Sequence, residues 1–489
     1  MKTDLKLLPK LLLLLLAMAL PMVAQAQFQY SVADGQATIT GYTGPGGAVI
    51  IPGTLGGFPV TTIGYSAFSH TASLTSVTLP NSVTILESFA FSDCNNLTSV
   101  NLPNSLIAIG FVAFGRTGLT NVSLPNSVTD LGFSAFSSCT SLTNISVAAG
   151  HPALSSVSGV LFNKLQTTLI QYPAGLTGSY VVPTSVTNIG YSAFTGCSRL
   201  TSVNIPNTVS MIGGDAFFGC SSLTSIDLPN GLIRIEAEAL YGCGSLTNVI
   251  LPTSITNIGS LAFGYCTSLT NMTLSSSLIT IKDYAFLGCS ALTSIAFPNS
   301  LSIIGERAFS DCIRLTSVTL PNHLTILGNW AFSACTNLTS VTFPSSLPTI
   351  GFDIFGYDPF GSCINLTAAY FQGNAPPDNG TIFVNDSKAT VHYLPGTSGW
   401  GATFGGRPTV QWNPRILTGN GLFGVQAGHF GFIFMGAANV HVAIEACSNL
   451  AQPNWATVTH LTCGGDGKVQ FTDPAVANQP GRYYRFRPE

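Results

Sequence analysis

Residues 97–119 read LTSVNLPNSLIAIGFVAFGRTGL, and the pattern of this stretch predicts the fold. Val100 and Leu102 alternate with the polar Asn101, which is the period of a strand with one buried face. Pro103 lacks an N–H group and therefore ends the strand. The stretch thus begins with a short half-buried strand that is followed by a turn.

The second half of the stretch predicts another side facing the same core. Leu106 and Ile109 turn inward again, and Gly110 permits the next corner of the chain. We expect the pair Ala113-Phe114 to fill the core from a short helical turn. One such unit cannot bury its apolar side alone, so neighbouring units must stack to build a continuous core.

The same pattern recurs along the chain, mostly in steps of 23 residues, with one step of 22 and one of 58. The recurring core positions are Phe68, Phe91, Phe114, Phe136, Phe194, Phe217, Leu240, Phe263, Phe286, Phe309, Phe332 and Phe355. We therefore expect a β-rich solenoid of about 12 turns with a 23-residue period. The long step predicts an inserted island at residues 147–182.

The consensus LTSVxLPNSVTxIGxxAFxxC resembles the BspA-type leucine-rich repeat of bacterial surface and secreted proteins, over about residues 63–370. The resemblance implies a right-handed leucine-rich-repeat solenoid. It also implies a non-enzymatic role in binding or adhesion, with ligands that differ among family members. The island at residues 147–182 is similar to one found in that family.

The N-terminus predicts a secretory signal peptide at residues 1–26, cleaved after Ala26. Three lysines precede the apolar run at residues 11–20, and residues 24–26 have the small-x-small pattern of a cleavage site. We expect a secreted or cell-surface protein with no transmembrane segment after signal removal. Losing three lysines and one aspartate changes the formal net charge from −3 to −5.

The regions that flank the repeats predict caps and a separate domain. We expect an N-terminal β cap at residues 27–62, the solenoid at 63–370, a C-terminal cap at 371–413 and a small all-β domain at 414–489. The strands expected in the last of these lie at 430–434, 440–446, 456–461, 468–471 and 483–486. This domain resembles a C-terminal β-domain of secreted verrucomicrobial proteins, through residues 445–450 and 482–485.

The amino-acid composition argues against nucleic acid as a partner. Only 8% of the residues are charged, against roughly 25% in an ordinary soluble domain. No basic face can be built from 17 lysines and arginines spread over the chain, which argues against nucleic acid. The partner that fits best is an extracellular protein or glycan, and we expect the protein to be a monomer.

No motif indicates a catalytic, cofactor or metal site. The G-x-G-x-x-G motif at residues 419–424 precedes a glycine-broken strand pattern, so it lacks the helix that a dinucleotide site needs. The seven histidines are scattered, which disfavours zinc. Asp227 alone is charged at the outward strand position, which disfavours a glycan-processing enzyme on a solenoid. Besides a binding scaffold, a self-associating matrix protein remains an alternative.

Ten of the twelve cysteines occupy one repeat position, which places them in a ladder. Thr117 takes the same position in one turn, so no sulfur is needed there. Parallel Cβ vectors in stacked turns fit poorly with disulfide geometry, and we expect buried, reduced thiols. A bond between Cys447 and Cys463 remains the less favoured alternative, because the two positions lie far apart along the expected hairpin.

A candidate ligand-binding stripe follows from the residue that precedes each Ala-Phe pair, which we expect on an outer turn. Steps of 23 give Asp215, Glu238, Leu261, Tyr284, Arg307, Trp330 and Asp353. Our hypothesis is that Tyr284, Arg307 and Trp330 anchor a partner, because such side chains dominate interface energetics. The alternatives are that these residues only keep the rod soluble, or that the site lies at Tyr65, Phe111, Phe133 and Tyr191 or at the island.

Overall fold

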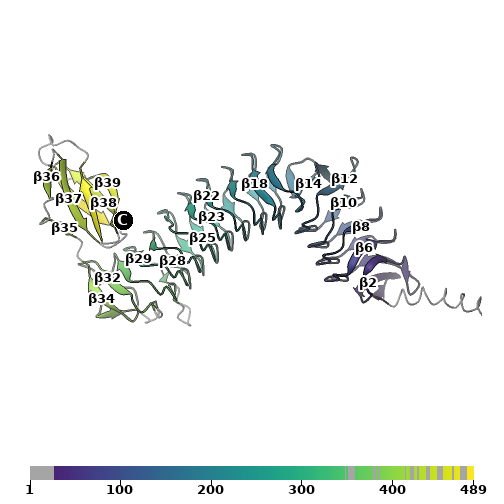
Figure 1. Ribbon diagram of the computed structural model, residues 1–489, viewed down its shortest axis with the longest axis horizontal. Coiled ribbons are helices and arrows are strands. Elements are labelled where there is room, and N and C mark those ends of the chain that lie inside the picture. Colours follow the sequence, from purple (N-terminus) through teal and green to yellow (C-terminus); the bar gives the residue numbers. More distant parts are fainter. Residues whose placement is uncertain are drawn as a thin grey trace, which may run out of the picture. The chain divides into compact units, whose positions relative to one another are not determined.

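Each repeat forms one coil of a β-solenoid, in which short strands on two sides of the coil lie parallel to those of the next coil (Figure 1). The register advances by one repeat at every step. Val77 pairs with Val100 on one side of the coil, and Ile281 pairs with Ile304 on the other. The alternating pattern of the sequence therefore produces the predicted solenoid, because each strand buries one face in the shared core.

The structure is a computed structural model, and its chain divides into two compact units. Unit 1 comprises residues 1–254 with 261–267, and unit 2 comprises residues 255–260 with 268–489. The described residues are 27–346, 349–350, 358–377, 382–383, 386–412, 415–418, 423–426, 429–436, 441–448, 455–464, 467–473 and 482–488. None of them belongs to a helix long and apolar enough to cross a membrane.

Two series of strands build unit 1. The first series is β3 (Gly47–Ile50), β6 (Leu74–Thr78), β8 (Ser99–Asn101), β10 (Asn121–Leu124), β12 (Asn144–Val147), β16 (Gly178–Val181), β18 (Leu200–Asn204), β20 (Ser225–Asp227) and β22 (Asn248–Ile250). The second is β5 (Phe58–Ile63), β7 (Ile85–Leu86), β9 (Ala108–Ile109), β11 (Asp130–Leu131), β17 (Asn188–Ile189), β19 (Met211–Ile212) and β21 (Arg234–Ile235). The hairpin of β1 (Phe28–Ala33) and β2 (Gln36–Tyr42) covers the start, where β2 pairs with β5.

Stacked phenylalanine rings fill the core of unit 1. Adjacent rings of Phe68, Phe91, Phe114 and Phe136 have centroids 5.0–5.6 Å apart and interplanar angles of 4–22°. The expectation of a short helical turn around the Ala-Phe pair is wrong, because the segment forms hydrogen-bonded turns whose amides reach the next coil. Phe91 N, for example, donates to Ala113 O at 2.8 Å. Coil-to-coil hydrogen bonds therefore alternate with local turn bonds, such as that from Ser92 N to Phe89 O at 3.0 Å.

Buried thiols form the predicted ladder, and all twelve cysteines are free. The Cys94 thiol donates to Phe68 O of the preceding coil at 3.0 Å, and Cys220 donates to Phe194 O at 3.2 Å. Burial raises the pKa of Cys94 to about 12, so this thiol stays protonated and remains a donor. Thr117 can replace cysteine because its hydroxyl also donates to a core carbonyl, that of Phe114.

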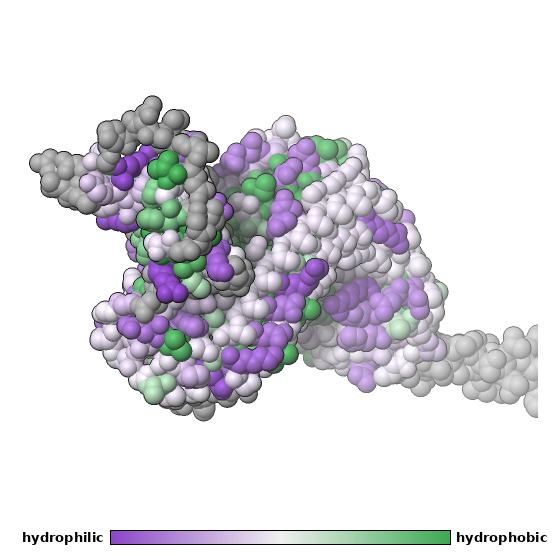
Figure 2. Space-filling model, turned by 60° about the vertical axis from the view of Figure 1, so that its left-hand side comes forward, coloured by the Kyte–Doolittle hydropathy of each residue, from purple (hydrophilic) through white to green (hydrophobic). Residues whose placement is uncertain are grey.

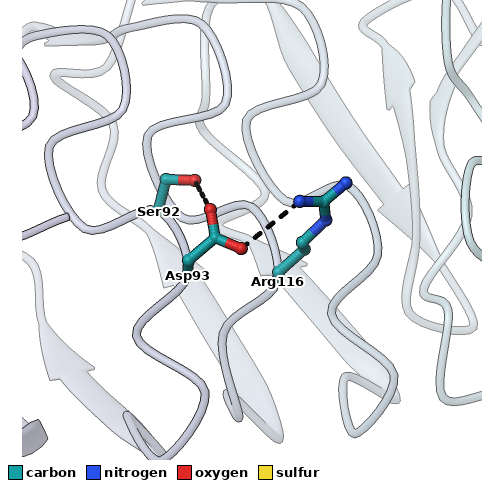
Figure 3. A network of polar contacts seen from close by, with 3 residues as sticks. All are labelled: Ser92, Asp93 and Arg116. Carbon is teal, nitrogen blue, oxygen red and sulfur yellow. Dashed lines mark hydrogen bonds and ion pairs between the residues drawn. The ribbon is translucent and has the colours of Figure 1, made fainter. Parts of the chain in front are cut away.

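Polar side chains also bridge neighbouring coils at the surface. Asp93 accepts a hydrogen bond from the Ser92 hydroxyl at 2.8 Å and lies 3.4 Å from the Arg116 guanidinium of the next coil (Figure 3). The Arg116 side chain is 68% exposed, so this ion pair adds at most about 1 kcal/mol to stability. The core rings and the backbone bonds hold the coils together.

The island interrupts the second strand series of unit 1. Its strands are β13 (Leu154–Val157), β14 (Val160–Asn163) and β15 (Thr168–Gln171), which pair in antiparallel order. Strand β15 then pairs in parallel with β17, whereas β11 ends its own sheet after pairing with β9. The continuous ladder of this side is therefore broken between β11 and β17.

Unit 2 continues the same coil architecture. Its strands are β23 (Asn257–Ile258), β25 (Thr280–Ile281), β26 (Ile303–Ile304), β28 (Ile326–Leu327) and β30 (Thr349–Ile350) on one side, and β24 (Asn271–Thr273), β27 (Ser317–Thr319), β29 (Ser340–Phe343), β31 (Ala368–Phe371), β32 (Thr390–Tyr393) and β34 (Arg407–Gln411) on the other. The last parallel pairs extend beyond residue 370, and the solenoid has about 15 turns rather than about 12.

The last core ring lies at a different position from the one that the 23-residue period predicts. A step of 23 residues leads to Phe355, which lies outside the described residues. The ring that stacks on Phe332 is Phe360, with a centroid distance of 5.5 Å and an interplanar angle of 4°. Cys363 then takes the ladder position and donates to Phe332 O. An extra five residues before this coil shift the register, which a fixed period cannot anticipate.

The C-terminal residues form two small sheets with all five expected strands. One sheet contains β35 (Arg415–Leu417), β36 (Gly424–Gln426), β37 (His429–Met435) and β40 (Lys468–Thr472), and the other contains β38 (His441–Cys447), β39 (Ala456–Thr462) and β41 (Tyr483–Pro488). Within unit 2, Tyr370 and Trp412 belong to the same apolar cluster as Phe432 and Phe434. Residues 419–422 of the G-x-G-x-x-G motif lie outside the described residues, and β36 begins at Gly424.

Candidate binding surfaces

We call the position two residues before each core Phe, or before Leu240, the slot. Its backbone geometry is left-handed in every coil from Phe68 to Phe332. Its φ values are 53° at Asp215, 56° at Glu238, 60° at Tyr284, 49° at Arg307 and 53° at Trp330. A non-glycine residue in this region costs about 1–2 kcal/mol, and yet none of these turns uses glycine. A side chain retained at a strained position points to a contact that the side chain makes.

In unit 2, three slot residues contact one another through side chains. The Arg307 guanidinium carbon lies 4.5 Å from the Trp330 ring centroid and 5.8 Å from that of Tyr284. The Tyr284 hydroxyl donates to Glu306 Oε1 at 3.0 Å. All three side chains are half-buried. The hypothesised anchors therefore contact one another, and we call this arrangement the cation–π ladder.

In unit 1, the slots of Asp215 and Glu238 lie in adjacent coils. Asp215 Oδ2 accepts a hydrogen bond from the Tyr191 hydroxyl at 2.6 Å, and this bond is the main cause that raises the pKa of Tyr191 to about 12. Burial raises the pKa of both carboxyls, and the proximity of Asp215 raises that of Glu238 further. Asp353 lies outside the described residues, and Asp358 holds the slot before Phe360.

A second feature of unit 1 is a row of aromatic side chains on one side of the coils. We call Tyr65, Phe89, Phe111, Phe133 and Tyr191 the aromatic ridge. Phe89 touches Tyr65 and Phe111 with centroid distances of 5.6 and 5.3 Å, and Phe133 meets Tyr191 at 6.0 Å. Tyr65 and Phe133 are 64% and 69% exposed. Much of the face seen in Figure 2 is pale, and strongly hydrophobic side chains occur there in small patches.

A cavity of about 460 Å³ lies beside Phe133 and Tyr191, where the island interrupts the ladder. Its apolar lining includes Leu131, Phe133, Leu161, Ile170, Ile189 and Met211. Gly213 also lines it, and a Cβ at that position would come within 2.7 Å of Tyr191 N, so the coils approach too closely for a side chain. We call this space the island cavity, and its volume lies in the range of small-molecule pockets.

The polar lining of the island cavity contains both hydrogen-bond donors and acceptors, among them Ser134, Thr168 and Gln171. The Gln171 amide donates to Tyr172 O at 3.1 Å, and Glu236 forms an ion pair with Arg234 at 2.6 Å. Asn188 Oδ1 is buried away from solvent and accepts no hydrogen bond from the described residues.

A shallower groove of about 430 Å³ lies along the same side of unit 1. Tyr65, Glu87, Phe111 and Asp130 line it, and Gly132 lines both this groove and the island cavity. The aromatic ridge and the two hollows therefore form one surface. No group of three or more metal-ligating side chains occurs in the described parts of the chain.

The sequence alone pointed to the exposed rings of Tyr65, Phe111, Phe133 and Tyr191 but not to the cavity beside them. Asn188 and Met211 pair in adjacent coils, whereas the island strand that contains Gln171 and the earlier strand end at Leu131 meet them only because of the insertion. The 58-residue step between Phe136 and Phe194 was the signal that could have pointed to this place. An interruption in a regular ladder leaves strand edges and core side chains without their usual neighbours.

Comparison with protein families finds one matching profile. The BspA type leucine rich repeat region matches in six copies, over residues 61–181, 176–278 and 256–375. A search of curated protein sequences finds no match.

Several solved structures share similarity with the chain. A leucine-rich repeat protein from Eubacterium ventriosum has 24% identity and a TM-score of 0.43, covering 57% of this chain and 91% of that one. A leucine rich cell surface protein from Faecalibacterium prausnitzii has 28% identity and a TM-score of 0.39, covering 59% and 92%. A leucine-rich repeat protein from Bacteroides ovatus has 24% identity and a TM-score of 0.41, covering 75% and 98%.

Proposed function

The chain belongs to the BspA-type leucine-rich repeat family, and on that basis we propose that it is a non-catalytic scaffold that binds extracellular macromolecules. Repeat scaffolds present extended surfaces on which side chains of successive turns act together. The signal-like N-terminus at residues 1–26 supports export to the cell surface or beyond it. Adhesion to a neighbouring protein or glycan is the role that fits this placement.

The observation that carries the proposal is the aromatic ridge of unit 1. Four of its five rings are exposed, and they form a row beside two hollows of the same surface. Aromatic rings bury a large area with little loss of conformational freedom, and they are enriched at the centres of interfaces. The cation–π ladder of Tyr284, Arg307 and Trp330 in unit 2 is the second candidate surface, and the sequence pattern also led to this hypothesis.

A binding screen with residues 27–489 tests the proposal. The protein is applied to arrays of extracellular proteins and glycans, beside the triple variant Phe111→Ala, Phe133→Ala, Tyr191→Ala and a second triple variant in which Tyr284, Arg307 and Trp330 become Ala. We expect a ligand whose binding falls at least tenfold in the first variant while circular dichroism stays unchanged. Loss only in the second variant would move the surface to unit 2.

A self-associating matrix protein is the competing function, and light scattering after size exclusion separates the two. A monodisperse monomer that binds an array ligand supports the scaffold. Concentration-dependent growth of the particle with no array ligand would overturn it.

A further inference from the structure

We infer that the island cavity of unit 1 receives a bulky apolar side chain from a partner protein, and that the carboxylates around the cavity hold lysine or arginine residues flanking that side chain. The inference rests on the proposed binding function and names the chemistry of its ligand. Three features of the described residues carry it: the shape of the cavity, the sheet end beside it and the charges near it.

The cavity has an apolar floor and an aromatic rim. Leu161, Ile189 and Phe136 at its lining are at most 1% exposed, whereas Phe133 and Tyr191 on the rim are 69% and 42% exposed. A flat platform of rings alone would suit many ligands. A hollow that reaches core side chains favours an inserted apolar group, because insertion removes from water both the apolar lining of the cavity and the surface of the inserted group.

The end of a sheet beside the cavity favours a peptide as the source of that apolar group. Strand β11 ends its sheet beside the cavity, where Leu131 is part of the lining. An extended segment laid along a sheet end places side chains alternately toward and away from the surface.

Three carboxylates lie at the cavity or close to it. Glu236 lines the cavity, Asp215 accepts the hydroxyl of the lining residue Tyr191, and Asp215 is close enough to Glu238 to raise the pKa of the Glu238 carboxyl. Arg234 pairs with Glu236, and the ammonium group of Lys164 on the island donates to Ala149 O. Within the described residues, Asp215 and Glu238 form no ion pair.

The adjoining groove has the same sign of charge. Glu87 and Asp130 line it, and neither forms an ion pair with a described residue. Glu87 accepts the backbone N–H of Tyr65 at 2.7 Å, which holds the carboxylate beside the ridge. An apolar side chain flanked by basic residues therefore complements the surface in both shape and charge.

The test uses synthetic peptides as probes and residues 27–489 as the protein. Dye-labelled, capped pentapeptides of sequence GKWKG, GQWQG, GEWEG and GKAKG are titrated by fluorescence anisotropy, with maltotetraose as a competitor. We expect GKWKG to bind at least fivefold more tightly than GEWEG and GKAKG, and we expect salt to reduce the difference from GEWEG. Equal binding of all four peptides, or displacement of GKWKG by maltotetraose, would overturn the inference.

Matched variants locate the binding. Phe133→Ala with Tyr191→Ala should weaken GKWKG at least fivefold, whereas Tyr265→Ala, which removes an exposed ring elsewhere in unit 1, should not. Asp215→Asn with Glu238→Gln should bring GKWKG to the affinity of GQWQG and leave GQWQG unchanged. Asn keeps the left-handed backbone and an acceptor for Tyr191, and Asp227→Asn on exposed β20 is the control for lost charge.

The two proposals fail in different ways. If the peptides do not bind but an array ligand is lost in the ridge variant, the scaffold function stands and the peptide inference is wrong. If GKWKG binds at the cavity but no array ligand responds to the ridge, the inference stands and the broader surface is wrong. Unchanged peptide affinity in both cavity variants contradicts the inference directly.

Discussion

The coils around residues 65–191 and those around residues 284–330 share one backbone pattern, but most of their surface aromatic rings stand one position apart. In unit 1, Tyr65, Phe133 and Tyr191 stand three positions before the core ring, and their slots hold serine, whereas the half-buried Phe89 occupies the slot itself. In unit 2 the rings of Tyr284 and Trp330 occupy the slot itself. The ring before the slot is exposed, whereas the ring in the slot is half-buried.

This difference separates rings that are available for a partner from rings that stabilise the solenoid. Trp330 and Tyr284 lie against Arg307, so part of their surface is already used within the protein. Phe133 meets only the edge of Tyr191 and keeps 69% of its surface in contact with solvent. A shift of one residue within a repeat can therefore decide whether a ring stays exposed for a partner or packs against its neighbours.

The largest effect should come from the core, where the two regions are alike. Phe114→Ala in unit 1 and Phe309→Ala in unit 2 should each lower the free energy of unfolding by about 3–5 kcal/mol, because both remove a ring stacked on two neighbours. Urea titration followed by circular dichroism measures this. A clearly unequal loss would show that the regions differ beneath the surface as well.

The next effect concerns the cation–π ladder of unit 2. Arg307→Met keeps much of the side-chain volume but removes the charge, and it should cost about 1 kcal/mol of stability. Arg314→Met, at an exposed position in the same unit, is the matched control and should cost much less. Equal losses in the two variants would mean that the slot does not stabilise the coils through this contact.

A smaller effect should appear in the pH dependence of unit 1. Burial raises the pKa of Asp215, so the folded state holds its proton to higher pH than the unfolded state does. Stability contributed by this group therefore falls as the pH rises above about 4, the ordinary carboxyl value. Asp215→Asn should be more stable than the wild type at pH 7 but not at about pH 4, as measured by urea titration. Asp227→Asn should show no such crossover, and a gain that is equal at both pH values would exclude ionisation as its cause.

The smallest effect on stability should come from the exposed ring itself. Phe133→Ala should change the free energy of unfolding by less than about 0.5 kcal/mol, since most of the ring is already in water. Thermal and urea unfolding of this variant beside Trp330→Ala gives the comparison. Should Phe133→Ala prove the more destabilising of the two, the division between available and packing rings would be reversed.

Much of this architecture follows from the sequence alone. The 23-residue period, the buried Phe positions, the free thiols and the five strands of residues 430–486 were all predictable. Each depends on local pattern, because a coil contacts only its neighbours and the same residue types recur at the same places. Core positions were less predictable where the repeat length changes. The 23-residue period predicts Phe355 as the last core ring, but Phe360 is the ring that stacks on Phe332.

Tertiary structure alone decided which rings are exposed and where a cavity opens. The slot looks like an outer position in the sequence, but its left-handed backbone directs Tyr284, Arg307 and Trp330 into contact with one another. The island cavity combines Leu131 from before the insertion with Asn188 and Met211 from the coils that follow it. No periodicity encodes that meeting, because it depends on how β15 pairs with β17 and leaves β11 at the end of its sheet.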